Sequence, residues 1–359
     1  MTDSSSRKSV PILRRIILYE HTATHFIVDL TCYYLLAATP WQLPFLEVAV
    51  IYVLIAFAAQ LLIGIWSDKR PQAPLLPIGL ALILIAFWPR GLLRLILMAA
   101  GNALFHTYAG RTILKRYSYT ANGLFNGAGG LGLVTGTWLG VTGHSHIFPF
   151  ALVIAALAAQ AAMYFVLQSA GREERVGHAA PAAPERYRLH KDTARTRTVM
   201  LLLLFIGAAF AEWSSLMSQP RVARNNISLL WIGAVAWLAK LLGSYVYQRL
   251  YSPTAVMIYT GTATIALAVM FPFPPTRFIA LAVIQILNLY PLYGMKALLP
   301  ERPGFAFGLN KLGLALAFLL SLLPRGFLTY LIPLFGLLIL SMYITLSLHR
   351  ESGTKEDLS

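Results

Sequence analysis

Ionisable side chains interrupt a segment that otherwise has the composition of a membrane-spanning helix. His25 and Asp29 lie four residues apart within residues 16–38, and His21 lies one turn earlier. Residues four apart share one face of an α-helix. An ionisable group in the hydrocarbon core is costly, and it is retained mainly where it lines a path or a binding site. This pair therefore indicates that the chain moves something across a membrane.

A second polar pair, Asn102 and His106, has the same spacing in a later apolar segment. The two segments are expected to run in opposite directions, which places the pairs at matching depth. Histidine titrates near physiological pH. We therefore predict that His25, Asp29 and His106 handle protons, with Asn102 beside them. The alternative is a static hydrogen-bonded cluster that pins two helices together.

The second part of the chain carries its own membrane ionisables, which are Glu212, Lys240 and Lys311. An ion pair between Glu212 and Lys240 would lower the cost of burying both. Lys311 has no acid nearby in its own segment, so it either attracts an anionic solute or extends to the membrane surface. Asn288 is a candidate solute contact, although polar side chains in membrane helices often serve as hydrogen bonds between helices.

Composition places the chain among polytopic helical membrane proteins. Of its 359 residues, 57% are hydrophobic and 12% are charged, about half the charged fraction of soluble proteins. The first apolar run lacks a small-residue cleavage site, so we expect it to remain as a span. The single cysteine, Cys32, excludes an intrachain disulfide and a zinc ribbon.

Apolar runs of membrane-spanning length predict an all-α protein with about twelve transmembrane helices. The first six are expected at 16–38, 44–66, 72–88, 91–111, 121–142 and 147–168, and the second six at 198–218, 227–249, 253–271, 277–297, 303–323 and 326–348. Pro74 and Pro77 fall near the start of the third run, and Pro291 falls within the tenth. Proline is tolerated in membrane helices where neighbours satisfy the freed carbonyl.

An even number of spans places both termini on one side of the membrane, and most of the 29 lysines and arginines fall on that side. The positive-inside rule then predicts an inner-membrane protein with cytoplasmic termini. The net charge of +15 reflects topology and contact with anionic lipid rather than a nucleic-acid partner. We expect residues 171–197 to form a basic cytoplasmic linker between a six-helix bundle at 1–170 and a second one at 198–359.

The two bundles show a weak internal repeat in a common order. Asp29 corresponds to Glu212, and Asn102 corresponds to Asn288. The remaining correspondences are Ala59-Gln60-Leu61-Leu62 with Ala239-Lys240-Leu241-Leu242, and Gly123-Leu124-Phe125-Asn126 with Gly308-Leu309-Asn310. Six-span halves keep one orientation, so they would be parallel repeats related by an axis along the membrane normal.

Two bundles joined by a central linker resemble a major facilitator superfamily transporter. The loop that contains Gly64, Asp68, Lys69 and Arg70 is similar to the glycine–aspartate–basic loop motif of that superfamily. Asp68 at a helix end can bond to the N-terminus of a facing helix and to Arg111, so we predict that Gly64, Asp68 and Arg111 act as a gate.

Within that superfamily, the N-terminal half resembles the fosmidomycin-resistance type of efflux protein. The resemblance rests on His25 and Asp29, on Phe105, His106 and Arg111, and on Leu124, Phe125, Gly129, Gly130, Gly132 and Gly136. Thr107 and Thr137 stand where that group has prolines. The resemblance implies proton-coupled export of a small organic solute, with antiport and alternating access between the two halves.

Some of the same residues would also suit other functions. The histidines His21, His25 and His106 with Asp29, and Cys32 nearby, could serve a transition-metal transporter, with His144 and His146 as an outer capture pair. A receptor or scaffold would tolerate neutralisation of these groups. We recognise no motif that specifies an enzyme or a nucleotide site, so we expect a monomeric, cofactor-free protein driven by an ion gradient.

Overall fold

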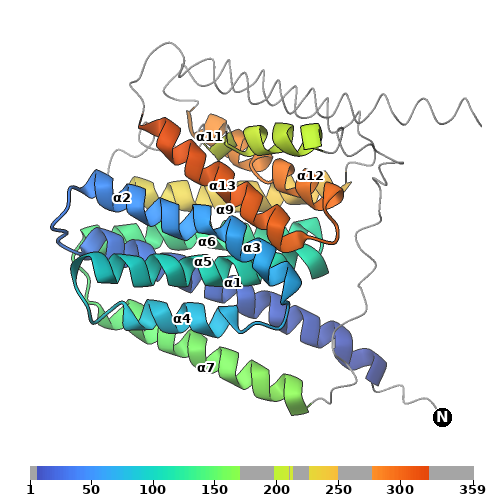
Figure 1. Cartoon of the computed structure of the whole chain (residues 1–359), viewed down its shortest axis with the longest axis horizontal. Coiled ribbons are helices and arrows are strands. Elements are labelled where there is room, and N and C mark those ends of the chain that lie inside the picture. Colours follow the sequence, from blue (N-terminus) through green and yellow to red (C-terminus); the bar gives the residue numbers. More distant parts are fainter. Residues whose placement is uncertain (1–5, 170–197, 210, 213–225, 250–276, 323–359) are drawn as a thin grey trace, which may run out of the picture.

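The computed structural model describes residues 6–169, 198–209, 211–212, 226–249 and 277–322. These residues form helices joined by short turns, and no strand occurs among them. The helices lie side by side with their long axes roughly aligned (Figure 1). We call the end of the bundle at which the first helix begins the terminal side, and the opposite end the far side.

The N-terminal half consists of α1 to α7 and accounts for the first six expected spans. Their bounds are α1 Ser6–Ala38, α2 Phe45–Val53, a π-helical segment η1 Leu54–Ala58, α3 Ala59–Lys69, α4 Leu75–Ile85, α5 Gly91–Arg116, α6 Tyr119–Val141 and α7 Ile147–Ser169. Helices α2 and α3 join through η1 into one continuous span, Phe45–Lys69. The π-helical segment lies beside the cavity described below, since Phe57 lines that cavity.

The C-terminal half contributes the helix Thr198–Ala209, α9 Asn226–Arg249, α11 Arg277–Leu287, α12 Tyr290–Leu298 and α13 Pro303–Ser321. These helices lie along one flank of the N-terminal half; α11 and α12 are above it in the view of Figure 1, whereas α9 and α13 partly overlap α2 and α3. The spans expected at 253–271 and 326–348, and the linker expected at 171–197, lie outside the described residues.

Several expected boundaries differ from the structure by a few residues, and the first, third and tenth spans are examples. Helix α1 begins ten residues earlier than expected, at Ser6. Helix α4 spans Leu75–Ile85 instead of the expected 72–88, and it begins only at Leu75 because Pro74 stands at its N-cap. The tenth span is two helices, α11 and α12, with Pro291 in the first turn of α12. Proline fits a first helical turn, where its missing N–H would have had no partner.

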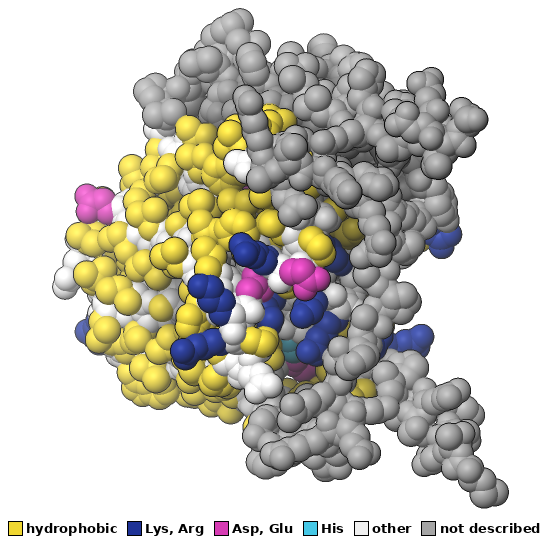
Figure 2. Space-filling model, turned by 45° about the vertical axis from the view of Figure 1, so that its right-hand side comes forward, with side chains coloured by type: hydrophobic (Ala, Val, Ile, Leu, Met, Phe, Trp, Pro, Cys, Tyr) yellow, Lys and Arg dark blue, Asp and Glu magenta, His cyan; other side chains and the backbone are white. Residues whose placement is uncertain are grey.

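Within the described part of the chain, five helices are long and apolar enough to cross a membrane. They are Phe45–Lys69, Gly91–Arg116, Leu229–Arg249, Leu281–Leu298 and Pro303–Ser321. Lysines and arginines gather where the end of the bundle comes forward in Figure 2, whereas the flank is covered by apolar side chains. Such an apolar flank with a basic end suits a protein embedded in lipid.

Close helix contacts hold the centre of the molecule together, and glycines make them possible. A Cβ at Gly132 would meet the backbone of Phe26, and one at Gly136 would meet the backbone of Leu30. Helix α6 therefore lies directly against α1, as small residues allow in membrane helices. This contact brings the polar residues of α1 into the interior of the protein.

Candidate functional site

The polar pairs of α1 and α5 meet in the interior, at the depth expected from the sequence. His25, Asp29 and His106 form what we call the His–Asp cluster, and their relative exposures are 3%, 7% and 2%. Nε2 of His25 lies 3.2 Å from Oδ2 of Asp29, and Nε2 of His106 lies 3.3 Å from Oδ1. Nδ2 of Asn102 donates to the same Oδ1 over 3.2 Å. The Asp29 carboxylate thus lies beside both imidazoles and accepts a hydrogen bond from Asn102.

The hydrogen-bond partners of the two imidazoles determine their tautomers. Nδ1 of His25 lies 2.8 Å from the carbonyl oxygen of Phe125, and Nδ1 of His106 lies 2.9 Å from the carbonyl oxygen of Asn102. A carbonyl oxygen only accepts hydrogen bonds, so each Nδ1 carries a hydrogen. If both rings are neutral, each Nε2 therefore presents a lone pair.

Those two Nε2 atoms are only 2.7 Å apart. Two lone pairs repel at that distance, whereas one hydrogen between them makes a normal hydrogen bond. One of the two imidazoles then carries a positive charge, which the adjacent Asp29 carboxylate balances. The geometry therefore suits a cluster that holds one shared proton.

Helix α6 leaves room for this cluster at Gly129. A Cβ at that position would lie 2.5 Å from Oδ2 of Asp29 and would also meet the ring of His25. A Cβ at the neighbouring Gly130 would meet nothing within 4 Å. Gly129 is thus the position at which any side chain would displace the cluster.

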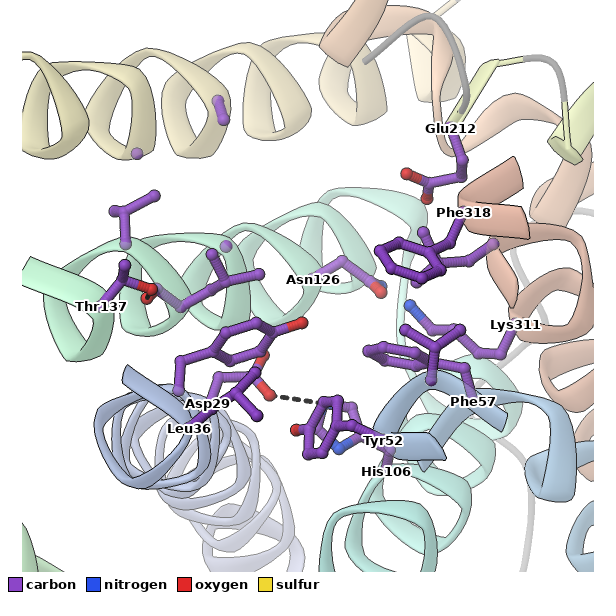
Figure 3. A pocket seen from close by; sticks show the side chains of 18 of the residues that line it. Asp29, Leu36, Tyr52, Phe57, His106, Asn126, Thr137, Glu212, Lys311 and Phe318 are labelled. Atoms are coloured by element: carbon purple, nitrogen blue, oxygen red, sulfur yellow. Dashed lines mark hydrogen bonds and ion pairs between the residues drawn. The ribbon is translucent and has the colours of Figure 1, made fainter. Parts of the chain in front are cut away.

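The cluster lies at the wall of a cavity of about 380 Å³ between the two halves (Figure 3). The cavity extends from the middle of the helices toward the far side, since its lining includes Leu36, Phe45 and Thr137. Tyr33, Tyr52, Phe57 and Phe318 add aromatic surface. A cavity of this size with an apolar lining and few polar groups is typical of a small-molecule site.

The C-terminal half faces the cluster with charges of both signs. Glu212, Lys240 and Lys311 all line the cavity. The expected Glu212–Lys240 ion pair is not formed among the described residues, where four ion pairs are found elsewhere. Asn288 does not line the cavity; it is buried at the break between α11 and α12.

At the terminal side, Asp68 joins the two halves, and we call this contact the Asp68 lock. Its Oδ1 accepts from Nε of Arg111 over 3.0 Å and from the backbone N–H of Gly304 over 2.9 Å. Its Oδ2 accepts from the backbone N–H of Phe305 over 2.8 Å. The carboxylate therefore caps the N-terminus of α13, where the helix dipole favours negative charge. Gly64 allows this approach, because its Cα faces the backbone of Gly304.

A second contact of the same kind, which we call the Gln248 lock, lies at the start of α6. Oε1 of Gln248 accepts from the backbone N–H of Thr120 over 3.1 Å and from its hydroxyl over 2.8 Å. Beside it, the hydroxyl of Tyr293 lies 2.6 Å from Oγ of Ser244 and donates to the carbonyl of Tyr119.

The two locks follow the internal repeat. A Cβ at Gly308 of α13 would meet the backbone of Gln60, and a Cβ at Gly123 of α6 would meet the carbonyl of Lys240. These are the same residues that the repeat aligns with each other, and the offset from Gln60 to Lys240 also leads from Asp68 to Gln248. The interface between the halves is therefore pseudo-symmetric along these helices.

The remaining metal-ligand candidates do not join the cluster. Nδ1 of His21 lies 2.6 Å from Oε2 of Glu20, and the thiol of Cys32 points to the carbonyl of Met98. His146 contacts the hydroxyl of Tyr34 and His144 contacts Thr142, so these two histidines have separate partners.

Sequence reasoning missed several residues that shape the site. The Phe125 carbonyl, which fixes the His25 tautomer, leaves no signal in the sequence because any residue supplies a carbonyl. Tyr33 and Tyr52, which line the cavity, read as ordinary apolar positions. Gln248 could have been found by extending the repeat beyond Lys240 to the counterpart of Asp68.

No family model and no curated protein matches this sequence. Solved structures do match its fold over nearly the whole chain. One is a bacterial homologue of the iron transporter ferroportin in an outward-facing state, with a TM-score of 0.62, 13% identity, and coverage of 95% of this chain and 99% of that one. Another is the major facilitator superfamily transporter FucP in the outward conformation, with a TM-score of 0.53, 15% identity, and coverage of 94% and 98%.

At these identities the similarity establishes the architecture alone. The described residues agree with this architecture, because they form helices without strands, include apolar spans and surround a cavity between two halves. The chain therefore has the fold of the major facilitator superfamily transporters.

Proposed function

We propose that this protein is a secondary active membrane transporter that works by alternating access and couples the movement of a small organic solute to protons. The observation that carries the proposal is the approach of the two Nε2 atoms to 2.7 Å beside Asp29. It gives the cluster a place for one proton, next to a cavity large enough for a small solute. The fold adds support, since transporters share it.

Alternating access requires a barrier on one side of the solute site at a time. The cavity extends to the far side, and the Asp68 and Gln248 locks bridge the halves at the terminal side. The distribution of lysines and arginines supports a cytoplasmic location for the terminal side. On that assignment the cavity extends toward the outside. Protonation of the cluster would bias the equilibrium between outward-open and inward-open states.

Export is the direction we favour, because the N-terminal residues resemble those of the fosmidomycin-resistance type of efflux protein. The solute would bind between the halves, against the cluster on one wall and Glu212, Lys240 and Lys311 on the other. The Asp68 lock would act as the terminal-side gate, with Arg111 holding the carboxylate in place. No enzymatic activity is part of this proposal.

Metal transport is the second candidate, because one specific observation favours it. Ligand atoms of His25, Asp29 and His106 all lie within 4.8 Å of one another, and both imidazoles donate Nδ1–H to carbonyls, as metal-bound histidines do. However, two imidazoles on one tetrahedral zinc at about 2.0–2.1 Å stand roughly 3.3 Å apart. The observed 2.7 Å matches a shared proton without rearrangement.

Reconstitution into proteoliposomes with a trapped pH dye tests the proposal. A panel of organic solutes and divalent metal ions is applied with and without an imposed pH gradient. We expect an organic solute to drive proton movement in the wild type, and Asp29→Asn and His25→Ala to abolish it. His144→Ala, at an exposed loop histidine, is the matched control and should transport normally.

Two results would contradict the proposal. Proton-coupled solute transport that persists in Asp29→Asn would remove the cluster from the coupling. Calorimetric binding of a divalent metal to the purified protein, lost in His106→Ala and accompanied by metal uptake, would establish the second candidate instead.

A further inference from the structure

Lys296 of α12 binds the turn between α5 and α6 in the opposite half. Its Nζ donates to the carbonyl oxygen of Tyr117 over 3.4 Å and lies 5.2 Å from the ring centroid of Tyr119. The side chain is partly buried, and among the described residues no carboxylate forms an ion pair with it. A partly buried cation without an acid is costly, so its place between the halves indicates a role there.

The internal repeat makes Lys296 the counterpart of Arg111. The offset that aligns Gly123 with Gly308 also leads from Arg111 to Lys296. The alignment of the two asparagines gives an offset that is one residue longer and leads to Ala297, which carries no charge. Both cations lie in the terminal-side part of their helices, α5 and α12. Lys296 is therefore the residue that matches Arg111 in both place and charge.

The backbone groups that the two locks bind follow the same offset. Asp68 accepts from the N–H of Phe305 at the start of α13, and Gln248 accepts from the N–H of Thr120 at the start of α6. The offset between the two cations also leads from Thr120 to Phe305. Each lock thus combines an acceptor at the end of one helix, the first turn of a helix from the other half, and a cation beside them.

The two locks differ in the charge of the acceptor. Oδ1 of Asp68 binds the guanidinium of its lock, and the carboxylate has a second oxygen for the backbone. Gln248 offers one oxygen, which accepts both the N–H and the hydroxyl of Thr120. A carbonyl oxygen has two lone pairs, so these two bonds use both. Lys296 instead bonds the carbonyl of Tyr117, three residues before Thr120.

We propose that Lys296 is a positioning residue of the terminal-side closure, and that the neutral Gln248 keeps the second lock weaker than the Asp68 lock. This inference rests on the proposed function, in which the terminal side opens once in every cycle. By holding the carbonyl of Tyr117, Lys296 keeps the start of α6 where Gln248 accepts from it. Because an uncharged acceptor binds a helix end less strongly than a carboxylate does, the closed state stays reversible.

Gln248→Glu tests the proposal by completing the second lock. Glutamate has the same length, and its second oxygen can accept from Lys296 while the first stays on Thr120. Charge-assisted hydrogen bonds are roughly twice as strong as neutral ones, so the ratio of closed to open terminal side should rise about tenfold. The substitution is made in the Asp68→Asn protein, where the first lock is weakened and a gain in closure is measurable.

Spin labels at positions 72 and 300 of the full-length protein report the separation of the halves. Gln72 and Pro300 are exposed in terminal-side turns, and neither belongs to the Gln248 lock. We expect Gln248→Glu to restore the short distance that Asp68→Asn loses. Adding Lys296→Gln should remove this gain, whereas Lys296→Arg keeps the charge and should preserve it. A lysine that only stabilised the fold would not make the effect of Gln248→Glu depend on its charge.

Lys115→Gln is the matched control, because Lys115 is an exposed lysine at the end of α5. It should leave the gain from Gln248→Glu intact. No gain from Gln248→Glu, or an equal gain in the presence of Lys296→Gln, would overturn the role of Lys296. If Asp68→Asn does not open the terminal side, the same comparison is read from the thermal midpoint. Gln248→Glu should raise that midpoint while Lys296 is present, and a midpoint that is unchanged, or raised equally without Lys296, would also overturn the proposal.

The outcome is separable from that of the proposed function. If the gain depends on Lys296 while no solute moves protons in the trapped-dye assay, the lock stands and the transport proposal fails. If proton-coupled transport is found while the gain is absent or independent of Lys296, transport stands and the role of Lys296 fails.

Discussion

The Asp68 lock gives a quantitative prediction about the conformational equilibrium. Asp68 and Arg111 have side chains that are each only 9% exposed, so the charge pair is largely shielded from water. Asp68→Asn removes the negative charge and leaves one oxygen to serve the Arg111 Nε–H and the Gly304 and Phe305 N–H groups. A hydrogen bond to a charged group contributes about 1.5–3 kcal/mol, and breaking a buried pair costs roughly 3–5 kcal/mol.

The substitution should destabilise the state with a closed terminal side by about 3 kcal/mol relative to the state in which that side is open. Because each 1.4 kcal/mol is a factor of ten, the equilibrium should shift by roughly a hundredfold toward opening of the terminal side. The assay is a spin-label distance distribution between positions 115 and 249, where Lys115 and Arg249 are exposed at the ends of α5 and α9. The single native cysteine, Cys32, is buried and does not compete for label.

Glu47→Gln is the matched control, because Glu47 is an exposed carboxylate near the start of α2 on the far side. It should leave the 115–249 distribution unchanged. Asp68→Asn should broaden that distribution and move it to longer distances. An Asp68→Asn distribution identical to that of the wild type would refute the idea that these contacts hold the terminal side closed.

Three further substitutions test the site and the second lock. Gly129→Ala places a methyl group against the His–Asp cluster and should abolish coupled proton movement in the trapped-dye assay, whereas Gly130→Ala meets open space and should not. Gln248→Ala removes the acceptor for Thr120, a neutral contact of about 1 kcal/mol, and should open the terminal side about fivefold in the same distance assay, less than Asp68→Asn. Tyr293→Phe removes a buried hydroxyl that bonds across the halves. It should lower the free energy of unfolding by about 1 kcal/mol, which a lower thermal midpoint of the purified protein would report.

Much of the helical framework could be predicted from the sequence, because lipid imposes a simple rule. Each span must be apolar over a fixed length, and that length is visible in composition alone. The spans at α5, α7, α9 and α13 begin within a residue of their expected positions. The break at Asn288, by contrast, depends on how α11 and α12 pack, and an uninterrupted apolar run does not reveal it.

The spacing of His25 with Asp29, and of Asn102 with His106, determined that each pair shares a helix face, since helical periodicity is a local property. Only the tertiary structure decided that the two faces meet, that both Nδ1 atoms bind carbonyls, and that Nε2 atoms distant in the chain lie 2.7 Å apart. It likewise placed Lys311 opposite Asp29, and among the ion pairs of the described residues none joins Glu212 to Lys240. These outcomes depend on close packing between helices, where a single glycine such as Gly129 sets the distance, and no local pattern encodes that distance.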